Sequence, residues 1–127
     1  MNLIIYNILP FNIIVKDITG KLIVISAPSG TGKTTVVKKL LQQSTNLEAS
    51  VSFTTRKMRQ NEKEGLDYCF VSKKTFANMI QNGDFLEHAT VFGNFYGTEK
   101  KSVSENLQKG VNVILEIDWQ GALQIKS

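Results

Sequence analysis

Residues 21–43 form the stretch that most constrains how this chain folds. The segment begins with a short apolar run, Leu22 to Ile25, of the kind that a strand buried on both faces shows. A glycine-containing turn follows at residues 27–34, and apolar residues then recur at helical spacing. A strand, a glycine loop ending in Gly-Lys-Thr and a helix, in that order, predict a phosphate-binding loop.

The residue types of this loop suit nucleotide phosphates. Gly30 and Gly32 allow backbone conformations in which successive N–H groups point at one anion, and the helix that follows adds its positive end. Lys33 is expected to reach the β- and γ-phosphates, and the Thr34 hydroxyl to ligate Mg²⁺. Ala27 stands where the common pattern has its first glycine. The predicted ATP-binding residues are Ala27, Pro28, Ser29, Gly30, Thr31, Gly32, Lys33, Thr34 and Thr35.

Composition narrows the class of protein further. The 127 residues suffice for one small domain with a core, and 42% hydrophobic with 20% charged residues is typical of a soluble globular protein. The net charge is +4, with basic residues in small groups that suit phosphate-bearing small ligands as well as nucleic acid. Because no interleaving of aromatic and basic residues stands out, we expect no nucleic-acid partner. The single cysteine, Cys69, agrees with a reducing cytoplasm and is expected to be a buried, inert thiol.

Residues 1–20 are apolar but do not predict a membrane span. Asn7, Pro10 and Asn12 interrupt the apolar run, which is also too short to cross a bilayer. No basic segment precedes the run and no small-residue cleavage site is clear, so a secretory signal is not expected. The segment is interpreted as an additional strand, a partner-binding arm or the product of a mis-chosen start codon, and these alternatives stay open. We expect a cytoplasmic protein with no membrane contact.

The middle of the chain predicts a small mixed lobe. Strands are expected at residues 51–55, 68–71 and 85–92, with a charged loop at 56–65. Ser72 is expected to cap a helix over residues 73–82 that ends at Gly83. The side chains expected to face inward from that helix are Phe76, Met79 and Ile80. Thr98 is expected to cap a further helix over residues 100–109.

A mostly apolar strand is expected at residues 111–118, and it ends in acids. In P-loop proteins an acid at the end of such a strand holds the Mg²⁺ hydration shell opposite the loop threonine. Asp118 is the first candidate, and Glu116 lies two residues earlier on the same face of the strand. Two solvated acids at a strand end are the alternative. Trp119 is expected in the core.

These patterns predict an α/β fold: a P-loop NTPase-type parallel sheet core with an inserted mixed α+β lobe. The core is assigned to residues 21–50 and 110–127, the lobe to residues 51–98, and a connecting helix to residues 99–109. Only two core strands, 22–26 and 111–117, and two helices are expected, so the core is incomplete at its C-terminal side and apolar edges are left uncovered.

Five motifs in the same order make the chain resemble the guanylate kinase family over roughly residues 20–127. They are SAPSGTGKTT at 26–35, SFTTR at 52–56 with Arg59 and Glu62, GLDY at 65–68, FLEHATVFGNFYGT at 85–98 and ILEIDWQG at 114–121. The resemblance implies transfer of the γ-phosphoryl group of ATP to GMP, giving ADP and GDP, with Mg²⁺ as cofactor. It also implies that the lobe at 51–98 binds GMP.

The resemblance implies a role for each residue of the site. Arg56 and Arg59 would clamp the GMP phosphate in two-point geometry, and Glu62 would orient them. Glu87 would accept hydrogen bonds from guanine N1–H and N2–H₂, which adenine cannot supply. The implied GMP-binding residues are Ser52, Arg56, Arg59, Glu62, Tyr68, Glu87, Tyr96, Thr98 and Asp118. The implied catalytic residues are Lys33, Arg56 and Asp118, and the implied metal-binding residues are Thr34, Glu116 and Asp118.

Complete members of this family continue well beyond this point, through a lid whose arginines contact ATP and through further core strands. The chain is therefore expected to be a fragment that binds GMP better than it turns it over. The alternatives are a non-catalytic guanylate-kinase-like module that binds GMP or a protein, and another P-loop kinase or GTPase. The non-catalytic modules typically lose the loop lysine and the phosphate arginines, whereas Lys33, Arg56 and Arg59 are present here. The sequence does not predict the oligomeric state.

Overall fold

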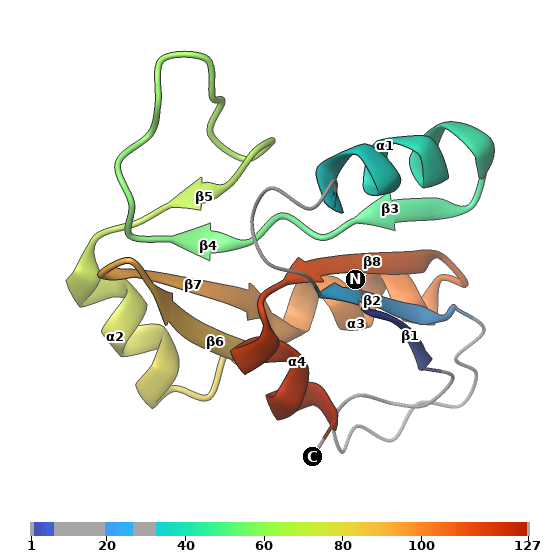
Figure 1. Ribbon diagram of the computed structural model, residues 1–127. Helices are drawn as coiled ribbons and strands as arrows, with labels where there is room; N and C mark the ends of the chain where they lie inside the picture. The colour runs from blue at the N-terminus through green and yellow to red at the C-terminus, as the bar shows by residue number, and fades with distance from the viewer. Residues whose placement is uncertain (1, 7–19, 27–32, 127) are drawn as a thin grey trace.

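The computed structural model describes residues 2–6, 20–26 and 33–126, which form two four-stranded sheets and the helices that cover them (Figure 1). The strands are β1 (Asn2–Tyr6), β2 (Leu22–Ser26), β3 (Leu47–Ala49), β4 (Phe53–Thr54), β5 (Cys69–Phe70), β6 (Phe85–Val91), β7 (Asn94–Glu99) and β8 (Asn112–Ile117). The helices are α1 (Lys33–Gln43), α2 (Lys73–Gln81), α3 (Lys100–Gln108) and α4 (Trp119–Lys126). The predicted α/β fold is confirmed.

The first sheet has the order β1-β2-β8-β3. Strands β2 and β8 are parallel, with Leu22 opposite Val113 and Ser26 opposite Ile117, and β3 is also parallel to β8. Their apolar runs follow from this arrangement, because a parallel sheet is covered by helices on both faces. Strand β1 pairs antiparallel with β2 and adds an edge.

Alternate residues of β2 and β8 serve two separate apolar layers. Leu22 and Val24 pack with Val103 and Leu107 of α3, and Ile125 of α4 lies against the same cluster. Ile25 and Ile114 face the other way and pack with Val37 of α1. In Figure 1, α1 accordingly lies on one side of the sheet and α3 on the other. This period-two alternation fixes which helix covers which face.

The second sheet has the order β5-β4-β7-β6, and α2 packs on it through aromatic rings. The Phe76 ring centroid lies 4.5 Å from that of Phe85 and 5.5 Å from that of Phe95. The Ser72 hydroxyl accepts a hydrogen bond from the Thr75 N–H at 3.1 Å, so the predicted cap is confirmed. The inward prediction for Ile80 was wrong, since 40% of that residue is exposed. Among the nine residues of α2, only Phe76 is fully buried.

The prediction of a two-strand core was wrong, because β1 and β3 also belong to the first sheet. Strand β3 lies in the polar stretch at residues 44–50, where Leu47 is the only large apolar residue. It pairs with β8 at the sheet edge, where one apolar residue suffices because solvent covers one side. Residues 1–20 were interpreted as an additional strand, a partner-binding arm or the product of a mis-chosen start codon. Because β1 pairs with β2, the first of these interpretations agrees with the structure. Residues 7–19 lie outside the described part of the chain.

Two side chains, Thr98 and Trp119, do not lie where the sequence predicted them. Thr98 does not cap a helix, because it lies inside β7 with no exposed surface. Helix α3 begins instead after Glu99, which makes no side-chain capping bond there. Trp119 is not in the core, since 68% of it is exposed at the start of α4. Across the three described ranges, no helix combines the length and apolar character needed to cross a membrane.

Phe92 occupies a backbone conformation that suits asparagine better. The predicted strand at 85–92 ends one residue early, because Phe92 and Gly93 have φ values of 50° and 78° and form the β6–β7 turn. Phe92 is also 95% exposed. We expect Phe92→Asn to stabilise the fold by about 1 kcal/mol, since Asn tolerates the left-handed conformation that turns of this kind require. Thermal unfolding checks this, and a lowered melting temperature would show that the Phe92 ring stabilises the fold.

Candidate functional site

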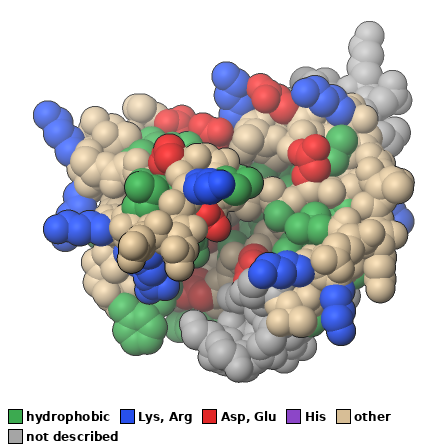
Figure 2. All heavy atoms as spheres, turned by 90° about the horizontal axis from the view of Figure 1, so that it is seen from above, with side chains coloured by type: hydrophobic (Ala, Val, Ile, Leu, Met, Phe, Trp, Pro, Cys, Tyr) green, Lys and Arg blue, Asp and Glu red, His purple; other side chains and the backbone are tan. Residues whose placement is uncertain are grey.

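A cavity of about 300 Å³ lies between the two sheets. Seven residues predicted for the site line it: Ser52, Arg59, Tyr68, Glu87, Tyr96, Glu116 and Asp118. They come from five strands or strand ends and the β4–β5 loop, so residues far apart in the sequence meet here. On the face that Figure 2 shows, Lys and Arg side chains of the described residues are scattered over the face and along its outline, and no single basic patch is visible.

The predicted ATP-binding residues are described less fully. Residues 27–32 lie outside the described part of the chain. Lys33 and Thr34 form the first residues of α1, directly after them, and their side chains are likewise outside the description. Thr35 is exposed in the first turn of α1. The strand and the helix of the predicted phosphate-binding loop are therefore observed, and the loop between them stays a prediction.

Glu87 is a buried carboxylate held by a neighbour on the next strand. It is 4% exposed, and the Thr98 hydroxyl, which is fully buried, donates a 2.6 Å hydrogen bond to Glu87 Oε1. A register shift between Phe85 and Glu87 brings Glu87 opposite Thr98 on β7. A β-bulge of this kind re-aims a side chain relative to the partner strand, so the pair depends on tertiary register rather than on sequence spacing.

Burial changes the chemistry of Glu87. The pKa of its carboxyl is raised to about 7, chiefly by desolvation; the hydrogen bond from Thr98 opposes the shift and the nearby Asp118 charge adds to it. The group therefore titrates near neutral pH. A carboxylate at this position would have one oxygen engaged by Thr98 and retain acceptor capacity for a ligand that donates hydrogen bonds.

The raised pKa of Glu87 predicts a pH-dependent stability. Its ordinary pKa is 4.5, so between that value and about 7 the folded chain keeps a proton that the unfolded chain has released. The free energy of unfolding should therefore fall as pH rises through this window, by on the order of 3 kcal/mol, and level off above it. Urea denaturation between pH 5 and pH 8 measures this. Glu87→Gln should lack this part of the slope, and equal slopes in both proteins would contradict the assignment.

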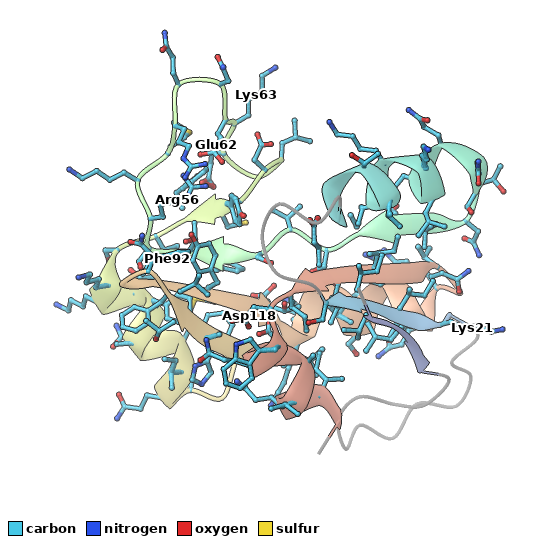
Figure 3. All side chains as sticks on the ribbon, in the orientation of Figure 1. Lys21, Arg56, Glu62, Lys63, Phe92 and Asp118 are labelled. Atoms are coloured by element: carbon cyan, nitrogen blue, oxygen red, sulfur yellow. The ribbon has the colours of Figure 1, made fainter. Side chains whose placement is uncertain are left out.

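Arg56 and Glu62 form a two-point ion pair in the β4–β5 loop (Figure 3). Arg56 Nη1 donates to Glu62 Oε1 at 2.9 Å, and Nη2 donates to Oε2 at 2.8 Å. The Arg59 backbone N–H also donates to Glu62 Oε1 at 2.8 Å. These bonds lower the Glu62 pKa to about 2, with the Arg56 hydrogen bond as the largest cause, and raise the Arg56 pKa. Glu62 thus holds the guanidinium of Arg56 and the backbone at Arg59.

Two tyrosines stand beside this ion pair. The Arg56 guanidinium carbon lies 5.2 Å from the centre of the Tyr68 ring, and the Tyr68 and Tyr96 ring centroids are 5.9 Å apart. Burial is the main cause that raises the Tyr68 pKa, so its phenol keeps its proton at neutral pH and can donate a hydrogen bond. A guanidinium and two phenols beside one cavity form a set of donors that suits an anion.

Asp118 does not belong to the strand that was predicted to carry it. Strand β8 ends at Ile117, and Asp118 caps α4, where Oδ1 accepts a 3.1 Å hydrogen bond from the Gly121 N–H. Its Oδ2 accepts from Gln120 Nε2 at 2.9 Å. Glu116 is the second-last residue of β8, and both acids line the cavity. Figure 3 shows Asp118 at the start of α4, below the loop that carries Arg56.

The donor set at this end of the cavity fits a magnesium ion. Carboxylate oxygens suit Mg²⁺, which is commonly held by one or two carboxylates together with substrate phosphates. Glu116 and Asp118 supply two carboxylates. Within the ranges that the structure describes, no group of three or more His, Cys, Asp or Glu side chains is placed to hold a metal. A magnesium ion at these two carboxylates would take its remaining ligands from water or a bound phosphate.

Residues that join α4 to β6 were not assigned any role from the sequence. Gln120 Nε2 donates to the Thr90 carbonyl at 2.9 Å, and Gln124 Oε1 accepts from the His88 backbone N–H at 3.0 Å. Gly121 lies between them, buried against Glu87. The signal was the WQG end of the ILEIDWQG motif, in which a glycine stands three residues after the predicted acid. Cys69, predicted to be buried, is half-buried, and burial raises the pKa of its thiol.

The fold defines the class of protein. Parallel strands β2 and β8, with α1 beginning at the lysine of the Gly-Lys-Thr sequence, form the core of an α/β protein of the P-loop nucleotide-binding type. A sequence model of the family described as guanylate kinase matches residues 19–127. The chain belongs to the guanylate kinase family.

Individual relatives agree with the family assignment. The chain is 56% identical over 108 residues to a guanylate kinase of Saccharophagus degradans, and the aligned region covers 85% of this chain and 53% of the relative. It is 50% identical over 112 residues to one of Legionella pneumophila strain Lens, with 88% and 54% covered. The crystal structure of guanylate kinase from Anaplasma phagocytophilum superposes with a TM-score of 0.69 at 46% identity, covering 87% of this chain and 54% of that one. The chain spans about half the length of these relatives.

Proposed function

We propose that this chain carries the GMP-binding site and part of the ATP site of an ATP:GMP phosphotransferase. The single observation that supports this most strongly is the buried Glu87–Thr98 pair, which faces a cavity lined also by Arg59 and two tyrosines. A base-recognising carboxylate and an anion-binding group in one cavity of about 300 Å³ suit a nucleoside monophosphate. Residues 51–98 would form the GMP-binding lobe.

Guanine would be selected by its donors. The Glu87 carboxylate, held by Thr98, would accept from guanine N1–H and N2–H₂, while the Ser52 hydroxyl would serve the O6 side. Adenine offers no such pair of donors, so it would leave a buried carboxylate unpaired. Proton release from Glu87 would accompany GMP binding at pH 6, because the carboxylate form is the acceptor.

The GMP phosphate would be held by guanidinium and phenol groups. Arg56 and Arg59 would clamp it, Glu62 would keep Arg56 in place, and the hydroxyls of Tyr68 and Tyr96 would donate to it. Fixing the phosphate in this way aligns one of its oxygens for attack on the γ-phosphorus of ATP. Positioning and charge neutralisation carry most of the catalysis in phosphoryl transfer.

ATP would lie at residues 27–35, with Lys33 at its β- and γ-phosphates. Thr34, Glu116 and Asp118 would hold Mg²⁺ directly or through water, and the bound ion would neutralise charge on the phosphates.

Production of ADP from Mg·ATP by the purified chain, with GMP, AMP or no acceptor, tests the proposal. GMP-dependent ADP formation above both controls supports the phosphotransferase. If ADP forms equally with or without GMP, the proposed reaction is wrong. GMP binding measured by calorimetry without any turnover would favour the non-catalytic guanylate-kinase-like module.

A further inference from the structure

Gly121 lies where α4 comes closest to the carboxylate of Glu87. The glycine is buried, and the Cα of any other residue there would carry a Cβ 2.9 Å from Glu87 Cδ and still closer to Oε2. Real Cβ atoms essentially never approach other atoms within 3.0 Å. The same Cβ would lie 3.3 Å from Ile117 Cδ1, so neighbouring atoms leave little space on another side. A side chain at position 121 and the observed Glu87 carboxylate therefore exclude each other.

Backbone conformation does not explain this glycine. Gly121 is the third residue of α4, and it is not among the glycines with positive φ, which are Gly65, Gly83, Gly93 and Gly110 in the described part of the chain. Glycine inside a helix is less favourable than alanine, because it has more conformational entropy to lose on folding. The close contact with Glu87 explains why position 121 is a glycine, whereas the helix conformation alone would favour alanine.

Helix α4 is held firmly enough that it would not simply tilt away. Asp118 caps its first turn through the Gly121 N–H at 3.1 Å, and Gln120 bonds the Thr90 carbonyl at 2.9 Å. One turn later, Gln124 accepts from the His88 N–H and donates to the His88 carbonyl. These bonds tie α4 to β6 on both sides of Gly121. Glu87 is the flexible partner, so an added Cβ would displace its carboxylate.

We infer that Gly121 is a positioning residue for base recognition: its missing side chain gives Glu87 Oε2 its place, while Thr98 fixes Oε1. This inference rests on the proposed function, in which both carboxylate oxygens face guanine. Accepting N1–H and N2–H₂ together requires the two oxygens to lie in the plane of the base. Because Thr98 holds Oε1, a rotated carboxylate would keep the hydrogen bond from guanine N1–H and lose the one that Oε2 accepts from N2–H₂.

The selectivity between GMP and inosine 5′-monophosphate tests the inference, because the inosine nucleotide lacks the 2-amino group. We expect Gly121→Ala to weaken GMP binding roughly tenfold and inosine monophosphate binding much less, which narrows the preference for GMP. Calorimetry at pH 8 gives both dissociation constants. The matched control is Leu123→Ala, on the exposed side of the same helix, which should leave the ratio unchanged. An unchanged ratio in Gly121→Ala would overturn the inference.

A shorter acid at position 87 should abolish the effect of Gly121→Ala on GMP affinity. Asp at position 87 withdraws the carboxylate from α4, so Gly121→Ala should cause no further loss of GMP affinity when it is added to Glu87→Asp. Additive losses in the double variant would mean that Gly121 acts elsewhere than on Glu87.

Thermal unfolding separates this inference from the proposed function, since it needs no ligand. In a Glu87→Ala background, Gly121→Ala should raise the melting temperature by about 4 °C, as a glycine-to-alanine change in a helix does. In the wild-type background Gly121→Ala should raise the melting temperature much less or lower it, because the added Cβ displaces the buried Glu87 carboxylate. Equal shifts in both backgrounds would overturn the inference even if GMP binds. If wild-type chain binds no GMP, unequal shifts would still support the contact while the proposed function fails.

Discussion

Glu87→Gln is expected to weaken GMP binding by about 100-fold, or ~2.7 kcal/mol, under the proposed function. The amide keeps the size of the acid and can still accept the hydrogen bond from Thr98. Its NH₂ group, however, would face a guanine N–H, so one hydrogen bond is replaced by two opposed donors in a buried place. Calorimetric titration with GMP at pH 8, where Glu87 is ionised, measures the loss.

AMP serves as the control ligand for this variant. Adenine presents an acceptor at N1 and a donor at N6, which match the amide of Gln better than they match a carboxylate. The ratio of GMP to AMP affinity should therefore fall by more than the GMP affinity alone. Equal losses for both nucleotides would indicate that the cavity had collapsed, and no loss for GMP would remove Glu87 from base recognition.

The second large effect is expected from Arg56→Lys, which keeps the charge but removes the planar fork. Arg56 makes two bonds to Glu62 at 2.9 and 2.8 Å, and a lysine ammonium cannot reproduce this pair while also contacting a phosphate. We expect GMP affinity to fall roughly 30-fold, or about 2 kcal/mol, as is typical for a charged hydrogen-bonded group. The affinity for guanosine, which has no phosphate, should change little.

Lys57→Met is the matched control for Arg56→Lys. Lys57 is the exposed neighbouring cation. Its backbone carbonyl, and not its side chain, accepts the 3.0 Å hydrogen bond from Arg56 Nη1. Removing this side-chain charge should change GMP affinity severalfold at most, since exposed charges act weakly through water. If Lys57→Met weakened GMP as much as Arg56→Lys, overall charge and not the Arg56 fork would explain the phosphate binding. If guanosine and GMP lost affinity equally in Arg56→Lys, the loop itself would be disturbed.

Local signals in the sequence predicted local structure well. Ser72 caps α2 and Gly83 follows it with positive φ, because a hydroxyl cap and a left-handed glycine are requirements of the helix ends themselves. The apolar runs of β2 and β8 predicted strands covered on both faces, which is where the sheet places them. Errors arose where burial depends on partners distant in the sequence, as for the exposed Trp119 and for Ile80.

The family, the order of strand, glycine loop and helix, and the residue types of the site could all be predicted from the sequence, because motifs and turn residues are properties of neighbouring positions. How those residues meet depends on the tertiary structure. The bulge in β6 brings Glu87 opposite Thr98, and the docking of α4 places Gly121 against the same carboxylate. Register and helix docking are set by packing between segments far apart in the chain, and no spacing within one segment encodes them.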